Sequence, residues 1–149
     1  MVALVEMVLS ACAAQPAVYP PATFAHRVAT QDVEIYWNCT KAESGLLQVD
    51  GVARNIGGRD VRFLNLEVES VNVRESRLLS AAAPLQALVL PINQLSPFQL
   101  QLPTRGDEAR YDLFYQYRVP SRLGALDPDA GERRFMARDV CSDTQNRSR

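Results

Sequence analysis

The chain has 149 residues, with 16 Lys and Arg against 17 Asp and Glu and a formal net charge of −1. This length suits one domain with a single hydrophobic core, because a core of that scale buries most of its apolar surface. The balanced charge supplies no overall field that would attract nucleic acid, and no run of apolar residues is long enough to predict a membrane-spanning helix. We therefore expect one domain that binds no nucleic acid.

Residues 2–14 form a short apolar segment that contains Leu9-Ser10-Ala11-Cys12. Its length is typical of the apolar region of a secretory signal rather than of a transmembrane span. The four residues resemble the lipobox of bacterial lipoproteins, in which a cysteine is acylated and becomes the new N-terminus. The resemblance implies a signal peptide over residues 1–11 and a lipid anchor on Cys12 that holds the protein at a membrane. The alternative is an N-terminal apolar helix with an incidental cysteine.

A proline-rich stretch follows, with three prolines within residues 15–22. Proline removes a backbone donor and favours extended chain, so we expect residues 12–30 to form a tether that includes His26, the only histidine. Ala13 follows Cys12 where an aspartate would signal retention. By similarity to lipoprotein sorting in Gram-negative bacteria, this implies an outer-membrane anchor that faces the periplasm.

From residue 31 to residue 142 apolar side chains recur at every second position, as expected for strands with one buried face. This alternation predicts strands at 33–37, 47–53, 61–73, 98–102, 111–119 and 133–140. The apolar, alanine-rich segment 78–90 fits either a short helix or two short strands, and we expect loop and strand there. In the third strand we expect Val61, Phe63 and Asn65 on one face and Leu64, Leu66 and Val68 on the other. A change of parity at Ser70-Val71 predicts a bulge or a switch between sheets.

Six or seven short strands without a long amphipathic helix predict an all-β domain, an immunoglobulin-like β-sandwich over residues 31–142. A barrel is the alternative. Residues 143–149 are expected to form a disordered tail.

The segment Gly51-Val52-Ala53-Arg54-Asn55-Ile56-Gly57 carries a family resemblance, together with the strand from Val61 and the later Leu95-Ser96-Pro97-Phe98. It is similar to the FxLYD-type and related immunoglobulin-like modules of bacterial envelope proteins, in which a Gly-x-Val-x-Asn-x-Gly segment ends one strand and opens the next. The similarity covers residues 46–119. It implies a non-catalytic adhesion, assembly or accessory domain, and so binding more than chemistry.

Once Cys12 is assigned to lipid, Cys39 and Cys141 remain as an even pair in an oxidising compartment. A disulfide between them would close a long loop and stabilise the fold. A metal or redox site is the alternative, but neither cysteine has a second Cys or His at ligand spacing, and metal sites normally take three or four protein ligands. We expect the disulfide, with no metal and no cofactor.

Catalytic patterns are missing from the sequence. A single histidine in a tether provides no catalytic triad, and there is no phosphate-binding glycine loop. Glu67 and Glu69 lie two apart on one strand, which indicates a solvated sheet surface rather than a general acid and base. Asp127 and Asp129 lie in an acidic turn without the regular ligand series that calcium needs, so we interpret it as a polar turn.

Three tyrosines share one face of the strand at 111–119 with Leu113 and Val119. This parity favours core packing, and the alternative is an exposed surface for a sugar or a partner. The loop at 121–132 is the longest polar connection, and such loops often carry contacts. Arg133, Arg134, Arg138 and Arg118 suggest a basic patch that Asp112, Glu132 and Asp139 neutralise. The candidate binding surface comprises Tyr111, Tyr115, Tyr117, Arg118, Arg122, Asp127 and Asp129.

Two functions follow from these patterns. The first is a non-enzymatic envelope lipoprotein whose sandwich binds an unknown envelope protein or supports assembly. The alternative is a small-ligand or carbohydrate-binding, or weakly enzymatic, periplasmic domain with a cleft built from Tyr111, Tyr115, Arg118 and the 121–132 loop. A filled sandwich favours the first, and a deep pocket with convergent polar groups favours the second.

Overall fold

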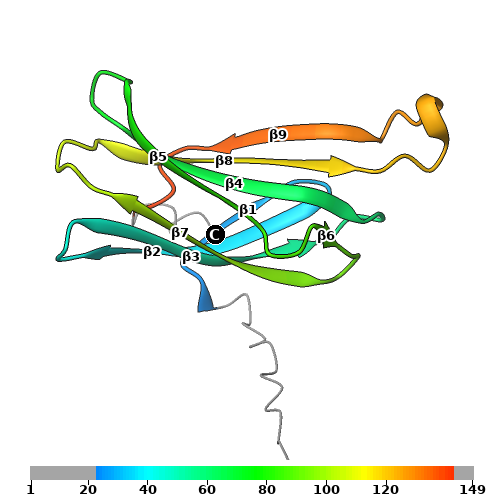
Figure 1. Cartoon of the computed structure of the whole chain (residues 1–149), viewed down its shortest axis with the longest axis horizontal. Coiled ribbons are helices and arrows are strands. Elements are labelled where there is room, and N and C mark those ends of the chain that lie inside the picture. Colours follow the sequence, from blue (N-terminus) through cyan, green and yellow to red (C-terminus); the bar gives the residue numbers. More distant parts are fainter. Residues whose placement is uncertain (1–22, 143–149) are drawn as a thin grey trace, which may run out of the picture.

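Two antiparallel sheets pack face to face in the computed structural model, which describes residues 23–142 (Figure 1). One sheet has the order β1-β2-β3-β7, and the other has the order β5-β4-β8-β9 with β6 also paired to β4. The predicted immunoglobulin-like sandwich is confirmed, and the barrel is excluded because the sheets do not join. The described elements are β1 (His26–Ala29), β2 (Val33–Ala42), β3 (Leu46–Asn55), β4 (Val61–Val71), β5 (Arg77–Pro84), β6 (Val89–Leu90), β7 (Leu95–Pro103), β8 (Arg110–Val119), the short 3-10 turn η2 (Gly124–Leu126) and β9 (Gly131–Ala137).

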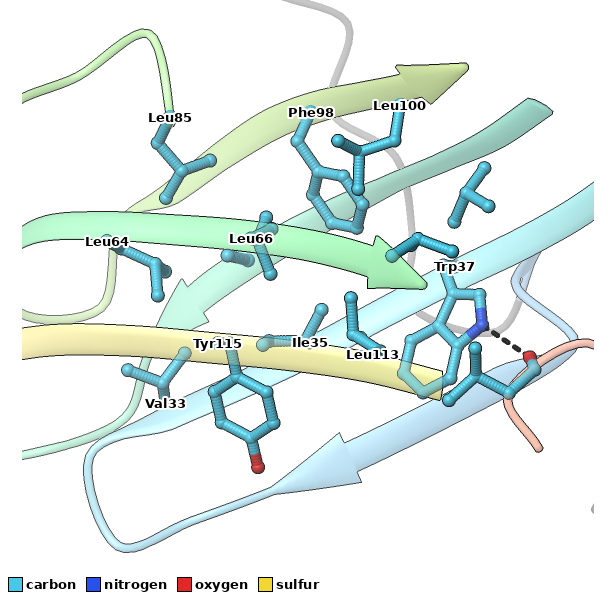
Figure 2. Packing of buried hydrophobic residues seen from close by; sticks show 14 of the residues in the cluster. Val33, Ile35, Trp37, Leu64, Leu66, Leu85, Phe98, Leu100, Leu113 and Tyr115 are labelled. Atoms are coloured by element: carbon cyan, nitrogen blue, oxygen red, sulfur yellow. Dashed lines mark hydrogen bonds between the residues drawn. The ribbon is translucent and has the colours of Figure 1, made fainter. Parts of the chain in front are cut away.

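The core lies between the sheets and is made of the alternating side chains (Figure 2). Ile35 and Trp37 from β2 meet Leu66 from β4 and Leu113 from β8, and all four are fully buried. The indole Nε1 of Trp37 donates a hydrogen bond of 2.8 Å to the carbonyl oxygen of Val140. The segment after β9 is thereby tied to the opposite sheet.

Gly51 lies in β3 directly opposite Phe98 of β7. A Cβ atom at this position would lie 2.5 Å from the Phe98 ring and 2.2 Å from the Tyr36 carbonyl oxygen, closer than real Cβ atoms come. Only glycine therefore lets the phenyl ring of Phe98 pack across the strand.

The first strand begins at His26, earlier than the predicted domain boundary at residue 31. The His26 ring stacks on Trp37 with 5.6 Å between centroids, and His26 is buried. The expectation that His26 lies in a tether is therefore wrong, because a strand of four residues is too short to show a period-two pattern. Cys12 and residues 143–149 lie outside the described residues.

The strand β4 contains a bulge that the alternation did not predict. Its register with β8 shifts between Arg62 and Asn65, and Phe63 has a φ of 53°. Val61 is buried whereas Phe63 is 57% exposed, so the expectation that they share a face is wrong. The irregularity expected at Ser70-Val71 is confirmed, because the register with β5 shifts there.

The predicted disulfide joins Cys39 of β2 to Cys141, with 5.5 Å between the Cα atoms and a sequence separation of 102 residues. It lies next to the Trp37 hydrogen bond to Val140. Within residues 23–142 there is no helix with the length and apolarity needed to cross a membrane.

Candidate functional site

The loops at one end of the sandwich form the candidate site, at the end where β4 begins and β8 ends. We call this end, residues 30–32, 55–63, 85–95 and 119–132, the distal end. The first described residues lie away from the distal end. The backbone N–H of Ala25 donates a hydrogen bond to the side chain of Asn38, which is part-way along β2. In Figure 1 the distal end carries β6 and the orange loop that contains η2.

Asn55 organises the turn between β3 and β4. Its side chain is fully buried and its amide donates to the carbonyl oxygens of Arg59 and Leu90, both at 2.8 Å. Its side-chain oxygen accepts from the Gly57 backbone N–H at 2.9 Å. The Asn-x-Gly part of the motif therefore has a structural role, since an aliphatic residue here would leave buried backbone groups without partners.

Asp127 organises the loop after β8. Its carboxylate accepts from the backbone N–H groups of Arg122 at 2.8 Å and Asp129 at 3.1 Å, and from the Arg59 guanidinium at 2.6 Å. The Arg122 backbone bond, followed by the bond from Arg59, lowers the pKa of Asp127 to about 2. Both carboxylate oxygens are engaged by protein donors, which supports the interpretation of this acidic segment as a polar turn. Residues 23–142 contain no group of three His, Cys, Asp or Glu residues placed to hold a metal ion.

The three tyrosines of the candidate surface are buried in the core, so their core packing is confirmed and the exposed tyrosine surface is wrong. Burial raises the pKa of Tyr111, Tyr115 and Tyr117, and all three hydroxyls stay protonated at neutral pH. The Tyr117 hydroxyl donates to Asp32 and contacts Thr30 Oγ1, both at 3.0 Å, which ties the two sheets together.

The polar residues of the candidate surface divide into two groups. Arg122 and Asp127 hold the loop in place, and the Arg122 side chain donates to the Gly58 carbonyl oxygen. Asp129 has an exposed side chain 3.7 Å from Arg59. Arg118 is exposed on the outer face of β8 and is available for binding.

A feature that the sequence analysis missed lies beside Arg118. Arg62 of β4 is directly opposite Arg118 of β8, and the bulge places the exposed Phe63 next to them. We call Arg62, Phe63 and Arg118 the Phe63 strip. It lies between surface hollows of about 490 Å³ and about 210 Å³, both lined by Phe63 and Arg118. No sequence pattern marks it, because it depends on the register between two strands.

Exposed apolar side chains gather at the distal end. The described residues include ten exposed large hydrophobic residues, of which only Val73 and Met136 lie outside this end. The other eight are Ile56, Phe63, Leu88, Val89, Ile92, Leu95, Leu123 and Leu126. Such a concentration is typical of a surface that another molecule covers.

The acidic pair on β4 lies on the outer face of its sheet, as the sequence predicts. Arg77 pairs with Glu67 at 2.5 Å and with Glu69 at 2.9 Å. Burial raises the pKa of Glu69 above its ordinary value, and the charges of Glu67 and Asp112 add to this, whereas Arg77 opposes it. The pair is therefore part of an ion-pair network.

Two of the four arginines expected in the basic patch form ion pairs, one of them with an acid that was expected to neutralise the patch. Arg133 pairs with Asp32 at 3.1 Å, and Arg134 pairs with Glu132 at 2.8 Å. Asp112 instead pairs with Arg110.

Comparison with known proteins shows a likeness of fold. No family model and no curated protein matches the chain. The GAE domain of GGA2p from Saccharomyces cerevisiae is 10% identical with a TM-score of 0.52, over 78% of this chain and 97% of that one. The GAE domain of yeast GGA1 is 14% identical with a TM-score of 0.53, over 76% of this chain and 96% of that one. Both solved structures share the sandwich architecture.

Proposed function

We propose that this chain is a non-enzymatic envelope lipoprotein that is anchored through Cys12 and binds a protein partner with the distal end of its sandwich. The observation that carries the proposal is the gathering of eight of the ten exposed large hydrophobic residues at that end. Protein interfaces have apolar centres with polar rims, and the distal end has both kinds of side chain.

The position of the distal end fits a tethered protein. The described chain begins beside Asn38, whereas β2 reaches the distal end at Val33. An anchor on the N-terminal side would leave the loops of the distal end free to meet a partner. The GAE domains are similar to this chain at low sequence identity, and they support only the assignment of the sandwich fold.

The small-ligand or weakly enzymatic alternative has less support. Two of its three named cleft residues, Tyr111 and Tyr115, are buried in the core with raised pKa values. Asp127 and Arg122 are engaged in holding the loop. Arg118 and the 121–132 loop share a surface hollow, but neither tyrosine lines it, so the named residues do not converge on one pocket.

Site-specific photo-crosslinking in the native cell tests partner binding. A photoreactive phenylalanine analogue would replace either Leu126 at the distal end or Val73 in the turn between β4 and β5, which are 87% and 84% exposed. We expect a discrete protein adduct from position 126 and none from position 73. Equal adducts from both positions, or none from either, would contradict the proposal.

Metabolic labelling with a palmitate analogue tests the anchor. We expect label on the wild-type chain and none on Cys12→Ala, because the thiol of Cys12 is the acylated group. An unlabelled wild type, or label that persists in Cys12→Ala, would contradict lipidation.

A further inference from the structure

Two positive charges oppose each other on the outer face of the β5-β4-β8-β9 sheet. Arg62 and Arg118 are cross-strand partners, and like charges in that position repel. Within residues 23–142 neither guanidinium has an ion pair or a hydrogen bond. The acidic residue opposite Arg118 on β9 is Glu132, which is bound by Arg134 at 2.8 Å. Asp60 lies two residues before Arg62, yet no ion pair joins them.

Phe63 follows Arg62 in the bulge and has an unfavourable backbone conformation. Its φ of 53° is in the left-handed region, where a bulky side chain is a genuine outlier. Among residues 23–142 the other non-glycine residues with positive φ are Glu75, Asn93 and Asp139, which are polar. The phenyl ring is also 57% exposed to solvent. Strain and exposure at the same residue indicate a functional site, because neither contributes to the stability of the fold.

Two surface hollows meet at the strip, because Phe63 and Arg118 line both of them. The hollow of about 490 Å³ continues from Phe63 and Arg118 to Pro120 and Ala125, and the hollow of about 210 Å³ continues to Gln116. Both hollows therefore lie along the outer face of β8 near its end. Two open hollows in line along one strand accommodate an extended chain better than a compact small molecule.

We propose that the Phe63 strip binds an acidic, extended segment of a protein partner. Carboxylates of the segment pair with Arg62 and Arg118, and an apolar side chain of the segment covers the ring of Phe63. Arginine forms charge-assisted, bidentate hydrogen bonds with carboxylates, and an aromatic ring next to arginine is typical of the residues that dominate interface energetics. This inference rests on the proposed function and names the chemistry of the partner.

A selection from a peptide library tests this inference on the full chain, purified in a mild detergent. Phage that display random dodecapeptides would be selected on the wild type, on the double variant R62Q/R118Q, and on F63N. A second double variant, R74Q/R105Q, is the matched control, because it removes the same charge from exposed arginines in turns at the opposite end of the sandwich.

We expect the wild type and R74Q/R105Q to select acidic peptides with an apolar residue. Binding of these peptides to R62Q/R118Q and to F63N should be at least about ten-fold weaker, because the charge-assisted contacts or the apolar contact are lost. Near-ultraviolet circular dichroism should show all variants folded.

Selected peptides without an acidic bias, or peptides that bind R62Q/R118Q as well as they bind the wild type, would overturn the inference. A failure to select any peptide would also overturn it. Vesicles of anionic phospholipid form a further arm, and binding of the vesicles that depends on Arg62 and Arg118 would assign the strip to a lipid surface instead. The crosslink from position 126 is independent of these results, so a partner that docks elsewhere on the distal end remains detectable.

Discussion

Two groups of residues, at the distal end and directly beside it, use their functional groups in opposite ways. Asn55 and Asp127 are buried, and their side-chain oxygen and nitrogen atoms are hydrogen-bonded inside the molecule. Arg62, Phe63 and Arg118 are exposed, and the two guanidinium groups make no internal polar contact among the described residues. The first group holds the loops in place, whereas the second group faces solvent on the strands β4 and β8.

This difference indicates which residues serve the fold and which serve binding. Removing a buried, hydrogen-bonded group leaves its partners unsatisfied and lowers stability. Stability is not lowered when an exposed charge that faces a like charge is removed, or when an exposed aromatic ring at positive φ is removed. We call the core, the disulfide, Asn55 and Asp127 the frame. Variants of the frame should therefore lose stability, whereas variants of the Phe63 strip should lose binding alone.

The largest effect is expected from the disulfide. The change Cys39→Ser with Cys141→Ser opens a loop with a sequence separation of 102 residues and should lower the free energy of unfolding by about 2–5 kcal/mol. Urea denaturation without reductant measures it. Cys12→Ser leaves the bridge intact and should unfold like the wild type. Equal stability of the bridged and unbridged chains would show that the frame does not depend on this crosslink.

The next effect is expected from Gly51→Ala. Its new methyl group collides with the Phe98 ring and the Tyr36 carbonyl oxygen, and overpacking of this kind should cost about 1–3 kcal/mol. Gly58→Ala is the matched control, because its Cβ would meet no atom within 4 Å. Thermal unfolding compares the two variants. A Gly51→Ala variant as stable as Gly58→Ala would contradict the packing at Phe98.

A pH-dependent effect is expected from Asp127. Its pKa of about 2 in the folded chain lies below the ordinary value of 3.8, so the ionised carboxylate stabilises the fold above about pH 4. This stabilisation is lost as the pH falls toward 2. The unfolding midpoint of Asp127→Asn should therefore lie below that of the wild type at pH 7, and the difference should shrink toward pH 2.

Asp129→Asn is the control for this titration, because the Asp129 side chain is 73% exposed and only its 3.7 Å contact with Arg59 would change. We expect a smaller difference from the wild type at pH 7. A deficit of Asp127→Asn that persists unchanged at pH 2 would show that the carboxylate charge is not its cause.

The smallest effect, with the opposite sign, is expected from Phe63→Asn. Asparagine tolerates the left-handed region better than phenylalanine does, so stability should stay the same or rise by up to about 1 kcal/mol. Phe63→Ala also removes the ring but lacks the polar side chain that makes asparagine tolerant of positive φ, so the difference between the two variants reports the backbone strain. A clear loss of stability in Phe63→Asn would place this residue in the frame.

Much of the frame was predictable because it depends on local patterns. Apolar residues at every second position predict β2, β3, β7 and β8, since successive side chains of a strand point to opposite faces. The shared parity of Tyr111 and Leu113 predicts the burial of the tyrosine. The disulfide was predicted from the even pair of cysteines that remains when Cys12 is expected to carry lipid.

The strand β1 and the bulge at Phe63 were not predictable from local patterns. Four residues are too few to show a period, and β1 forms because His26 stacks on Trp37 and the strand pairs with β2. One extra residue at Phe63 shifts every side chain before it to the other face, and its position depends on the register with β8. Alternation within a single strand therefore assigned Phe63 and Val61 to the same face.

The amino-acid sequence by itself determined the class of fold, the buried face of most strands and the pairing of the two cysteines, because these follow from the order of side chains along the chain. Only the tertiary structure decided that Arg59 meets Asp127 and that Arg62 faces Arg118. These residues are distant in the sequence, and they come together through strand register and loop packing. The candidate site depends on such long-range contacts, so it becomes visible only in the folded chain.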